Sequence, residues 1–476
     1  METSHESTNE LVEGNLLPQD LYSLAQALEL GRTRNSALHR SHLNPRHVAL
    51  AELVQIDKPL IRAYGPFFWD SDGNQYLDFL GGFAALLLGH NHPRLNRALR
   101  QVDELPGLVE GLSILSAALA HNLAVLAPGD LNRVYFANSG AEVVDAAIKL
   151  ARAATGRTRL VACSKGFHGR TVGALSLMDR REYHDPFAPL LAGVRIVPFG
   201  DTDALEAALC RSDVAACVVE PIQGEGGIVV PPAGYLTAAR ALCTQYGTLL
   251  VVDEVQTGLG RTGRLFAVNA EAVIPDVLLL GKALGGGVMP LSALLTTDRL
   301  YFASKGNTVR TPFHTSTYGG NSRACAVGLA MLEVLIEEDL VQQAHVSGDY
   351  FLARLRDVQR RQPLIADVRG SGLMIGVEFV SATRGLATLA TAGLVNRLSR
   401  DFLSALIIQR MLVHHRVFLG MTLNNSNVIR FQPPLNVEKK YIDYVISTFE
   451  ETLDFIGSFP RAALRAVPDL VDLMRA

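Results

Sequence analysis

The stretch LLVVDEVQTGLGRTG, residues 249–263, decides the fold class of this chain. Its four leading apolar residues are typical of a strand buried on both faces, as in a parallel sheet covered by helices. The run ends on the acidic pair Asp253 and Glu254, and the glycines after it indicate a loop. Ligands bind beyond the carboxyl ends of such strands, so Asp253 is predicted to lie beside a ligand. Its alternative role is a helix N-cap or one half of an ion pair.

A second apolar run, in DVLLLGKALGGGV at residues 276–288, ends on a lysine. A buried ammonium is costly, so Lys282 either reaches outward to solvent or reacts as a neutral amine. The spacing between Asp253 and Lys282 leaves room for a loop, some helix and a return strand. We therefore expect both side chains at the same end of one sheet.

The surrounding sequence extends this pattern. From about residue 110 to 310, short apolar strands such as ACVVEP alternate with helical segments such as YLTAARALCTQYG, which predicts βαβ units and a mostly parallel sheet. FFWDSDGNQYLDF at 67–79 predicts a hairpin around Asp72-Gly73. After about residue 320, one long helix over 322–361, a strand within 365–379 and further helices predict a separate α+β domain.

Composition narrows the class of partner. At 476 residues the chain exceeds what one core usually holds, so we expect a large and a smaller domain. The formal net charge is −3 and the basic residues are dispersed, which argues against a nucleic-acid or membrane surface and for a small-molecule partner. Five scattered cysteines without a CxxC pair predict reduced thiols and a cytoplasmic location. We find no secretory h-region and no run long enough to span a membrane, and His90 and His92 lack further metal ligands.

Lysine and aspartate at one sheet end suit pyridoxal phosphate. This coenzyme needs a lysine for a Schiff base and a carboxylate that keeps its pyridine nitrogen protonated. FANSGAEVVDAAIKLAR at 136–152 supplies a strand-to-helix junction whose amides would face the phosphate, although Ser139 could simply cap the helix. KGFHGRT at 165–171 offers Phe167 for ring stacking, although a lone aromatic residue is more often part of a core.

Seven motifs in this order resemble the class III pyridoxal-phosphate aminotransferases of fold type I: NSGAE, GFHGRT, EPIQGEGG, DEVQTGLGRTG, GKALGGGVMP, HTSTYGGN and IRFQPPL. The resemblance runs from about residue 65 to 450. Within the family, LGGF at 80–83 and TLNN at 422–425 look most similar to putrescine aminotransferases. The implied fold is α/β, with a large, mainly parallel sheet sandwiched by helices and a smaller α+β domain.

The resemblance implies a domain organisation. Residues 1–20 are poor in apolar and aromatic residues and rich in Glu, Ser and Asn, so their composition predicts a mobile arm. By the resemblance, residues 21–105 would contribute to the small domain and to a dimer interface. Residues 106–335 form the large coenzyme-binding domain, and residues 336–476 form the C-terminal small domain.

The resemblance also assigns the coenzyme site. Lys282 would form the Schiff base and shuttle the proton, Asp253 would pair with the ring nitrogen, and Gln256 would donate to the phenolic oxygen. The remaining coenzyme residues would be Phe167 and Val255 on the two ring faces, His168, the phosphate-binding Ser139, Gly140 and Ala141, and Thr317 from the neighbouring subunit. Sharing Thr317 implies a homodimer.

The implied substrate residues are Phe83, Arg170, Glu225 and Arg430. Glu225 would pair with Arg430 while an amine is bound and release it to a dicarboxylate. Phe83 stands where ornithine enzymes carry a tyrosine, and Arg170 stands where putrescine enzymes can carry lysine, so Arg170 could hold a substrate carboxylate. We expect the three leucines at 86–88 to pack in the core. The alternative is that Leu86, Leu87 and Leu88 line an apolar binding pocket for the amine.

The implied reaction moves the amino group of a putrescine-like terminal amine or diamine to 2-oxoglutarate by ping-pong chemistry, or aminates an aldehyde in reverse. Alternatives are an ornithine- or acetylornithine-type aminotransferase, and a decarboxylase or aminomutase on the same fold. A coenzyme-binding DNA regulator is disfavoured because no basic recognition helix is found, and a dinucleotide enzyme because no GxGxxG follows the first strand.

Overall fold

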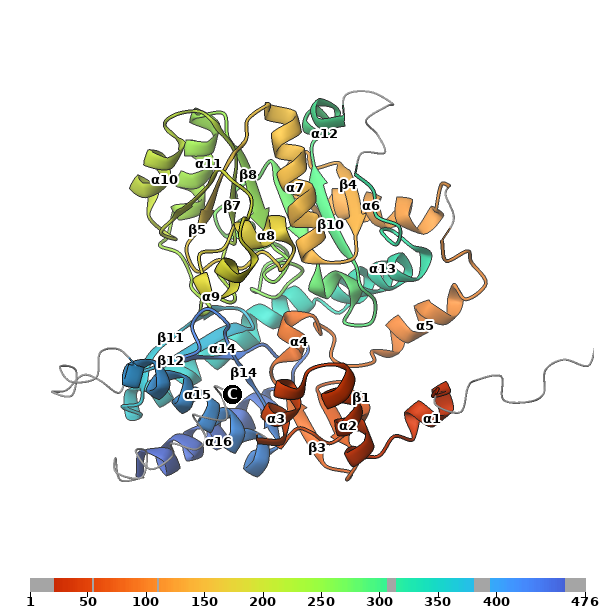
Figure 1. The fold of residues 1–476 in the computed structure, drawn as a ribbon, viewed down its shortest axis with the longest axis vertical. Helices are drawn as coiled ribbons and strands as arrows, with labels where there is room; N and C mark the ends of the chain where they lie inside the picture. Colours follow the sequence, from red (N-terminus) through yellow and green to blue (C-terminus); the bar gives the residue numbers. More distant parts are fainter. Residues whose placement is uncertain (1–20, 54, 109–110, 306–313, 381–393, 459–476) are drawn as a thin grey trace, which may run out of the picture.

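The computed structural model describes residues 21–53, 55–108, 111–305, 314–380 and 394–458 (Figure 1). The arm predicted for residues 1–20 lies outside these ranges. Among the described residues, no helix combines the length and the apolar character needed to cross a membrane.

The upper part of the molecule in Figure 1 is built on a seven-stranded sheet. Its strands, in spatial order, are β4 (Arg133–Ala137), β10 (Ser292–Thr296), β9 (Val277–Leu280), β8 (Leu249–Asp253), β7 (Val214–Val219), β5 (Arg159–Cys163) and β6 (Val194–Val197). Only β10 runs antiparallel to its neighbours, and the pairs from β9 to β6 are parallel. The predicted large, mainly parallel sheet is confirmed.

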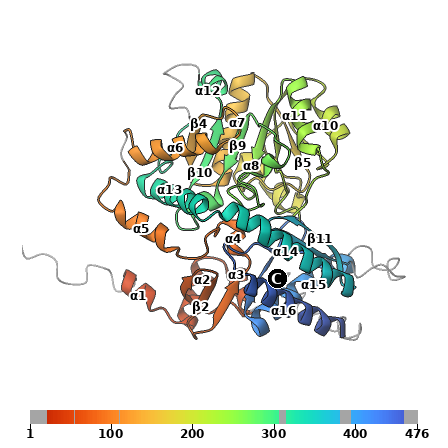
Figure 2. The same cartoon turned by 180° about the vertical axis from the view of Figure 1, so that it is seen from behind.

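Both faces of this sheet are covered, which explains the unbroken apolar runs. Leu249 and Val251 share a buried cluster with the long helix α7 (Gly140–Thr155), whereas Leu250 and Val252 share another with α11 (Tyr235–Gln245) and α13 (Ser322–Glu337). Figures 1 and 2 show α7 and α13 on opposite faces of the sheet. The other helices of this part are α5 (Pro93–Gln101), α6 (Ile114–Leu126), α8 (Val172–Ser176), α9 (Arg181–His184), η1 (Asp185–Phe187), α10 (Thr202–Leu209), η2 (Ala267–Ala270), η3 (Lys282–Gly285) and α12 (Asp298–Lys305).

The lower part combines the first and last described segments of the chain, which lie together in Figures 1 and 2. One four-stranded antiparallel sheet has the order β11 (Ile365–Ser371), β12 (Met374–Phe379), β15 (Val428–Phe431) and β14 (Gly420–Met421). The other four-stranded sheet is mixed, because its last pair is parallel. Its order is β1 (Leu60–Tyr64), β2 (Phe67–Asp70), β3 (Gln75–Asp78) and β13 (Val417–Phe418). The associated helices are α1 (Leu24–Leu28), α2 (Arg32–His42), α3 (Pro45–Leu53), α4 (Gly81–Ala84), α14 (Leu340–Arg361), α15 (Leu394–His415) and α16 (Lys439–Ser458).

Pairing of β13 with β3 joins the C-terminal part of the chain to the N-terminal segment. The hairpin predicted over 67–79 is confirmed as β2 and β3. The second, smaller α+β unit is likewise confirmed. The four residue ranges given above for the arm and the domains stay predictions.

Two local predictions were wrong. The single helix expected over 322–361 is divided into α13 and α14, because Asp339 takes a left-handed backbone conformation with φ of 48°. The single strand expected within 365–379 is the hairpin of β11 and β12, which turns at Gly372. Leu87 and Leu88 are buried, as expected of core residues, whereas Leu86 is only half-buried.

Candidate active site

The carboxyl ends of β8 and β9 place the predicted aspartate and lysine together. Asp253 is the last residue of β8, and Lys282 follows β9 after one glycine. The parallel register sets Asp253 opposite Leu279, so both functional groups lie at the same sheet end, as predicted. Lys282 has a left-handed φ of 40°, a strained conformation of the kind that persists at functional sites. Burial lowers the pKa of the Lys282 amine, an effect that Glu225 and Asp253 partly offset.

Asp253 is held rigidly by two donors. His168 Nδ1 lies 2.8 Å from Asp253 Oδ2, and the backbone N–H of Val255 donates to Oδ1 over 3.1 Å. Burial alone would lower the pKa of His168, but the hydrogen bond to Asp253 and the negative charges of Asp253 and Glu220 together outweigh burial and raise it. The arrangement keeps a negative charge fixed at the strand end, where it can pair with a protonated ring nitrogen.

A cavity of about 160 Å³ opens beside these residues. It is lined by Gly140, Ala141, Phe167, His168, Gly169, Glu220, Glu225, Asp253, Val255, Gln256 and Lys282. The structure therefore brings together most of the predicted coenzyme residues from separate segments of the chain. Ser139, Thr317, Phe83, Arg170 and Arg430 are not part of this lining.

The predicted phosphate-binding residues at the start of α7 have two different roles. Ser139 is the N-cap, and its side chain accepts a hydrogen bond from the backbone N–H of Glu142 over 3.3 Å. The Glu142 carboxylate accepts the N–H groups of Asn138 and Ser139, at 2.9 and 2.7 Å. Gly140 and Ala141 line the cavity, and their first-turn amides have no intrahelical acceptor, so the positive end of the helix dipole can bind an anion there.

The lining fits pyridoxal phosphate. Among the described protein atoms, buried Gln256 Oε1 has no hydrogen-bond partner, and the Nε2 donor has only a long contact of 3.5 Å with the Phe83 carbonyl, so the Gln256 amide can donate to a ligand. A Cβ at Gly224 would lie 1.7 Å from Gln256 Oε1, and one at Gly140 would lie 2.9 Å from Val255, so only glycine permits these approaches. An anion-binding helix end, a fixed carboxylate and an amine whose pKa burial lowers match the phosphate, ring nitrogen and aldehyde of the coenzyme.

Glu225 and Arg430 form an ion pair beside the cavity. Arg430 Nη1 donates to Oε1 over 2.7 Å, Nη2 contacts Oε2, and the guanidinium is completely buried. The backbone N–H of Leu423 also donates to Oε2, over 3.0 Å. Burial alone would raise the pKa of Glu225, but Arg430, the charge of Lys282 and the N–H of Leu423 together outweigh burial and hold the pKa below its usual value.

Three predicted residues remain, namely Phe83, Arg170 and Thr317, and none of them lines the cavity. The Phe83 ring centroid is 5.3 Å from Arg430 Cζ, and the Phe83 carbonyl is 3.5 Å from Gln256 Nε2. Arg170 Cζ lies 5.6 Å from the Phe167 ring centroid and 3.9 Å from that of Tyr183. Thr317 is exposed and lies outside the cavity of its own chain.

Two lining residues were missed by the sequence analysis, Gly169 and Glu220. Glu220 directly follows the buried strand β7, just as Asp253 ends β8. The same strand-end pattern that identified Asp253 could therefore have identified Glu220.

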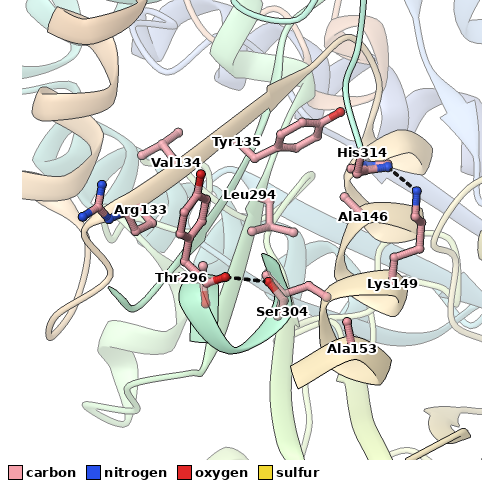
Figure 3. A pocket seen from close by; sticks show the side chains of 12 residues that line it. Arg133, Val134, Tyr135, Ala146, Lys149, Ala153, Leu294, Thr296, Ser304 and His314 are labelled. Carbon is pink, nitrogen blue, oxygen red and sulfur yellow. Dashed lines mark hydrogen bonds between the residues drawn. The ribbon is translucent and has the colours of Figure 1, made fainter. Parts of the chain in front are cut away.

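A larger cavity, of about 200 Å³, lies at the sheet edge between α7 and α12 (Figure 3). Its lining includes Val134 and Leu294, and Lys149 Nζ lies 2.7 Å from His314 Nδ1 at one side. None of the predicted site residues lines it. Size alone does not select this cavity, because the acid, base and anion-binding groups gather at the smaller one.

Comparisons with known proteins agree with this geometry. The profile of the family described as Aminotransferase class-III matches residues 52–453. Aminotransferase PigE of Serratia sp. (strain ATCC 39006) is 38% identical over 461 residues, which is 90% of this chain and 54% of PigE. The chain thus spans about half the length of this curated relative.

Two similar solved structures contain pyridoxal phosphate (PLP). A structure of ornithine aminotransferase from Toxoplasma gondii, with partial PLP occupancy at its active site, has a TM-score of 0.74 and 33% identity, covering 83% of this chain and 90% of that chain. A PLP-bound amine transaminase from an uncultivated Pseudomonas species has a TM-score of 0.73 and 29% identity, covering 83% and 94%.

Proposed function

Because this chain belongs to the class III aminotransferases, we propose that it moves the amino group of a terminal aliphatic amine or diamine to 2-oxoglutarate. The products are an aldehyde and glutamate, and the same residues serve the reverse amination of an aldehyde. The donor is putrescine-like, and the observation that carries the proposal is the buried pair of Glu225 and Arg430.

Pyridoxal phosphate is the cofactor of the site. Gly140 and Ala141 would hold its phosphate, Phe167 and Val255 its ring faces, Asp253 its ring nitrogen, and Gln256 its phenolic oxygen. When bound, the coenzyme supplies an electron-withdrawing ring that stabilises negative charge on a substrate carbon. Lys282 would hold its aldehyde end.

The chain's own residues manage protons and charge. Nζ of Lys282, whose pKa burial lowers, would take a proton from the carbon that bears the substrate nitrogen and deliver it to the aldehyde carbon of the coenzyme. His168 holds Asp253 in one orientation, so the carboxylate charge stays fixed beside the ring nitrogen. Both residues are buried, which strengthens these interactions by excluding water.

The ion pair explains how one pocket serves two substrates. With Glu225 seated on it, Arg430 presents no free charge to an amine. A dicarboxylate offers a carboxylate that can replace Glu225 in bidentate contact with the guanidinium. The amine and the oxo acid thus use the same space in alternate half-reactions.

An apolar donor is supported by the surface next to Arg430. Phe83 is 48% exposed, and its ring supplies no hydroxyl to bind a second polar group on the donor. Leu423, beside Glu225, is also exposed. An aliphatic chain would contact these two side chains.

An ornithine-like donor is the second candidate. Arg170 is exposed and lies beside Phe167, held over the ring of Tyr183. Its guanidinium is suited to the carboxylate of an amino acid that reacts through its distal amine. Arg170→Gln should abolish a response to ornithine and leave a response to putrescine.

A homodimer is part of the proposal, with Thr317 entering the partner's site. Thr317 is exposed and lies away from its own cavity. Helix α6 is mostly apolar, yet Ile114 near its start and Val125 near its end are 72% and 69% exposed, which is typical of a face that a second subunit covers. All five cysteines are free thiols and four are buried, which supports a cytoplasmic location.

The test is the visible absorption of the purified protein with putrescine, ornithine, 4-aminobutyrate and longer monoamines added singly, without an oxo acid. We expect one donor to bleach the coenzyme band and 2-oxoglutarate to restore it. A band that no amine changes would refute the proposed donor class, and the absence of any band would refute coenzyme binding.

A further inference from the structure

Glu220 has a carboxylate that joins two separate turns of the active site. It directly follows β7 and is only 6% exposed. Its Oε1 accepts the backbone N–H of Phe167 over 2.9 Å, and its Oε2 accepts that of Gly224 over 3.0 Å. Burial raises the pKa of Glu220 to about 7. Burying a carboxyl is costly unless it is hydrogen-bonded, and in Glu220 each of the two oxygens accepts a backbone N–H.

The two turns carry different parts of the machinery. The first presents Phe167 to the cavity, and His168 next to it binds Asp253. The second presents Glu225, which binds Arg430. Glu220 is thus the side chain that connects the coenzyme's stacking surface with the substrate's ion pair.

The same two turns are also fastened to each other by Asn424. Its side-chain Nδ2 donates to the carbonyls of Lys165 and Gly166, at 2.9 and 3.1 Å. Its backbone N–H donates to the carbonyl of Glu225 over 2.8 Å. Gln223 adds a third link, since its Nε2 donates to the carbonyl of Ser164 over 2.8 Å. Glu220 differs from both because it binds the backbone N–H of Phe167, next to His168, and that of Gly224, next to Glu225.

We propose that Glu220 is a positioning residue that keeps Glu225 seated on Arg430 while it fixes Phe167 against the coenzyme. Both of its targets are N–H donors, so a group with two acceptor oxygens is required. Glutamine would turn an NH₂ group toward one of the donors, and aspartate would withdraw the carboxylate by about 1.5 Å, the length of one C–C bond. The inference rests on the proposed use of Arg430 by a dicarboxylate.

The proposal predicts two effects of opposite sign. Loosening the turn at Phe167 weakens coenzyme binding. Loosening the turn at Gly224 weakens the hold of Glu225 on Arg430, so a dicarboxylate meets less competition and binds more tightly. A purely structural role would weaken both kinds of binding together.

The experiment measures two dissociation constants at pH 8: that of pyridoxal phosphate from the apoprotein, and that of glutarate from the holoenzyme. Glutarate is a dicarboxylate without an oxo group, so it binds without reacting. For Glu220→Asp we expect the coenzyme constant to rise about tenfold and the glutarate constant to fall about fivefold, since one hydrogen bond to a charged group is weakened in each turn. Glu220→Gln should shift both constants in the same directions.

Two controls separate positioning from charge. Glu254→Gln removes another buried carboxylate, next to Asp253, whose oxygens accept the N–H groups of Ala267 and Val268 and not those of the cavity turns. It should leave both constants within twofold. If only Glu220→Gln and not Glu220→Asp changes glutarate binding, the charge is responsible and the proposal is refuted.

A double-mutant cycle tests the route through Glu225. In Glu225→Gln protein the competitor is already weakened, so adding Glu220→Asp should no longer tighten glutarate binding. A further gain would overturn the proposal. If glutarate fails to bind even Glu225→Gln protein, the assignment of Arg430 in the proposed function is refuted. If it binds there and Glu220→Asp alone has no effect, only the role of Glu220 is refuted.

Discussion

The substitution Glu225→Gln tests how the site exchanges an amine for a dicarboxylate. In the folded protein the Glu225 carboxylate accepts hydrogen bonds from Arg430 and from the backbone N–H of Leu423. Glutamine keeps one oxygen for these donors and turns an NH₂ group toward the others. It also removes the only side-chain carboxylate that forms an ion pair with Arg430 among the described residues.

The expected cost to stability follows from the burial of both groups. Breaking a buried ion pair by removing one partner costs about 3–5 kcal/mol, because the other charge is left uncompensated. One hydrogen bond is retained, so we expect a loss near the lower limit of that range, about 3 kcal/mol in the free energy of unfolding of the apoprotein. Urea unfolding measures this value.

The expected gain in ligand binding has the opposite sign. A dicarboxylate no longer has to displace a charged competitor, and a hydrogen bond to a charged group contributes about 1.5–3 kcal/mol. Glutarate should therefore bind the Glu225→Gln holoenzyme about tenfold more tightly or better, since each increment of about 1.4 kcal/mol is tenfold. Isothermal titration calorimetry at pH 8 measures the dissociation constant of glutarate for the unchanged holoenzyme and for the Glu225→Gln holoenzyme.

Arg430→Gln is the matched control, because it removes the other half of the same pair and should abolish the gain. If Glu225→Gln protein is folded and binds glutarate no more tightly than the unchanged protein, Glu225 does not compete for Arg430. The explanation of dual substrate use would then be wrong.

Three further predictions concern the lysine, a buried acid and the subunit interface. Lys282→Ala should leave a folded dimer without turnover, measured by circular dichroism and by glutamate formation, and retained turnover would contradict the whole site assignment. Burial raises the pKa of Glu254 to about 7 from 4.5, so between these pH values the folded protein holds a proton that the unfolded chain has lost. The free energy of unfolding therefore falls as pH rises from about 5 to 7. At about 1.36 kcal/mol per pKa unit, Glu254→Gln should remove roughly 3 kcal/mol of that fall, as measured by urea unfolding at several pH values. An unchanged dependence of the unfolding free energy on pH would contradict the raised pKa. Ile114→Glu should dissociate the dimer by placing a charge on the exposed apolar face of α6, as measured by light scattering, and an intact dimer would exclude α6 from the interface.

Much of the coenzyme pocket could be predicted from local sequence, because its residues stand at the ends of strands. Asp253 and Lys282 each follow an unbroken apolar run, and a parallel sheet necessarily brings such ends to one edge. The junction at Gly140 was predicted by the same logic, since a helix that starts after a strand directs free amides toward that edge.

Other features had no local signal. The break between α13 and α14 depends on a left-handed residue, Asp339, inside a sequence that is otherwise typical of one helix. The role of Ser139 as an N-cap and the burial of Leu87 were each left open by the sequence, because both outcomes satisfy the same local pattern.

The sequence by itself determined the class of fold, the strand ends and the chemical groups available there, because apolar runs and their terminators act over a few residues. Only the tertiary structure decided which groups meet across long separations. The pairing of Glu225 with Arg430, on β15 of the smaller unit, was expected only from the resemblance to a family and from no local pattern. The contacts of Glu220 with two turns that are distant from each other in the chain were not expected at all. Such contacts depend on how the smaller unit packs against the large sheet, and that packing is fixed by the whole buried surface and not by any single motif.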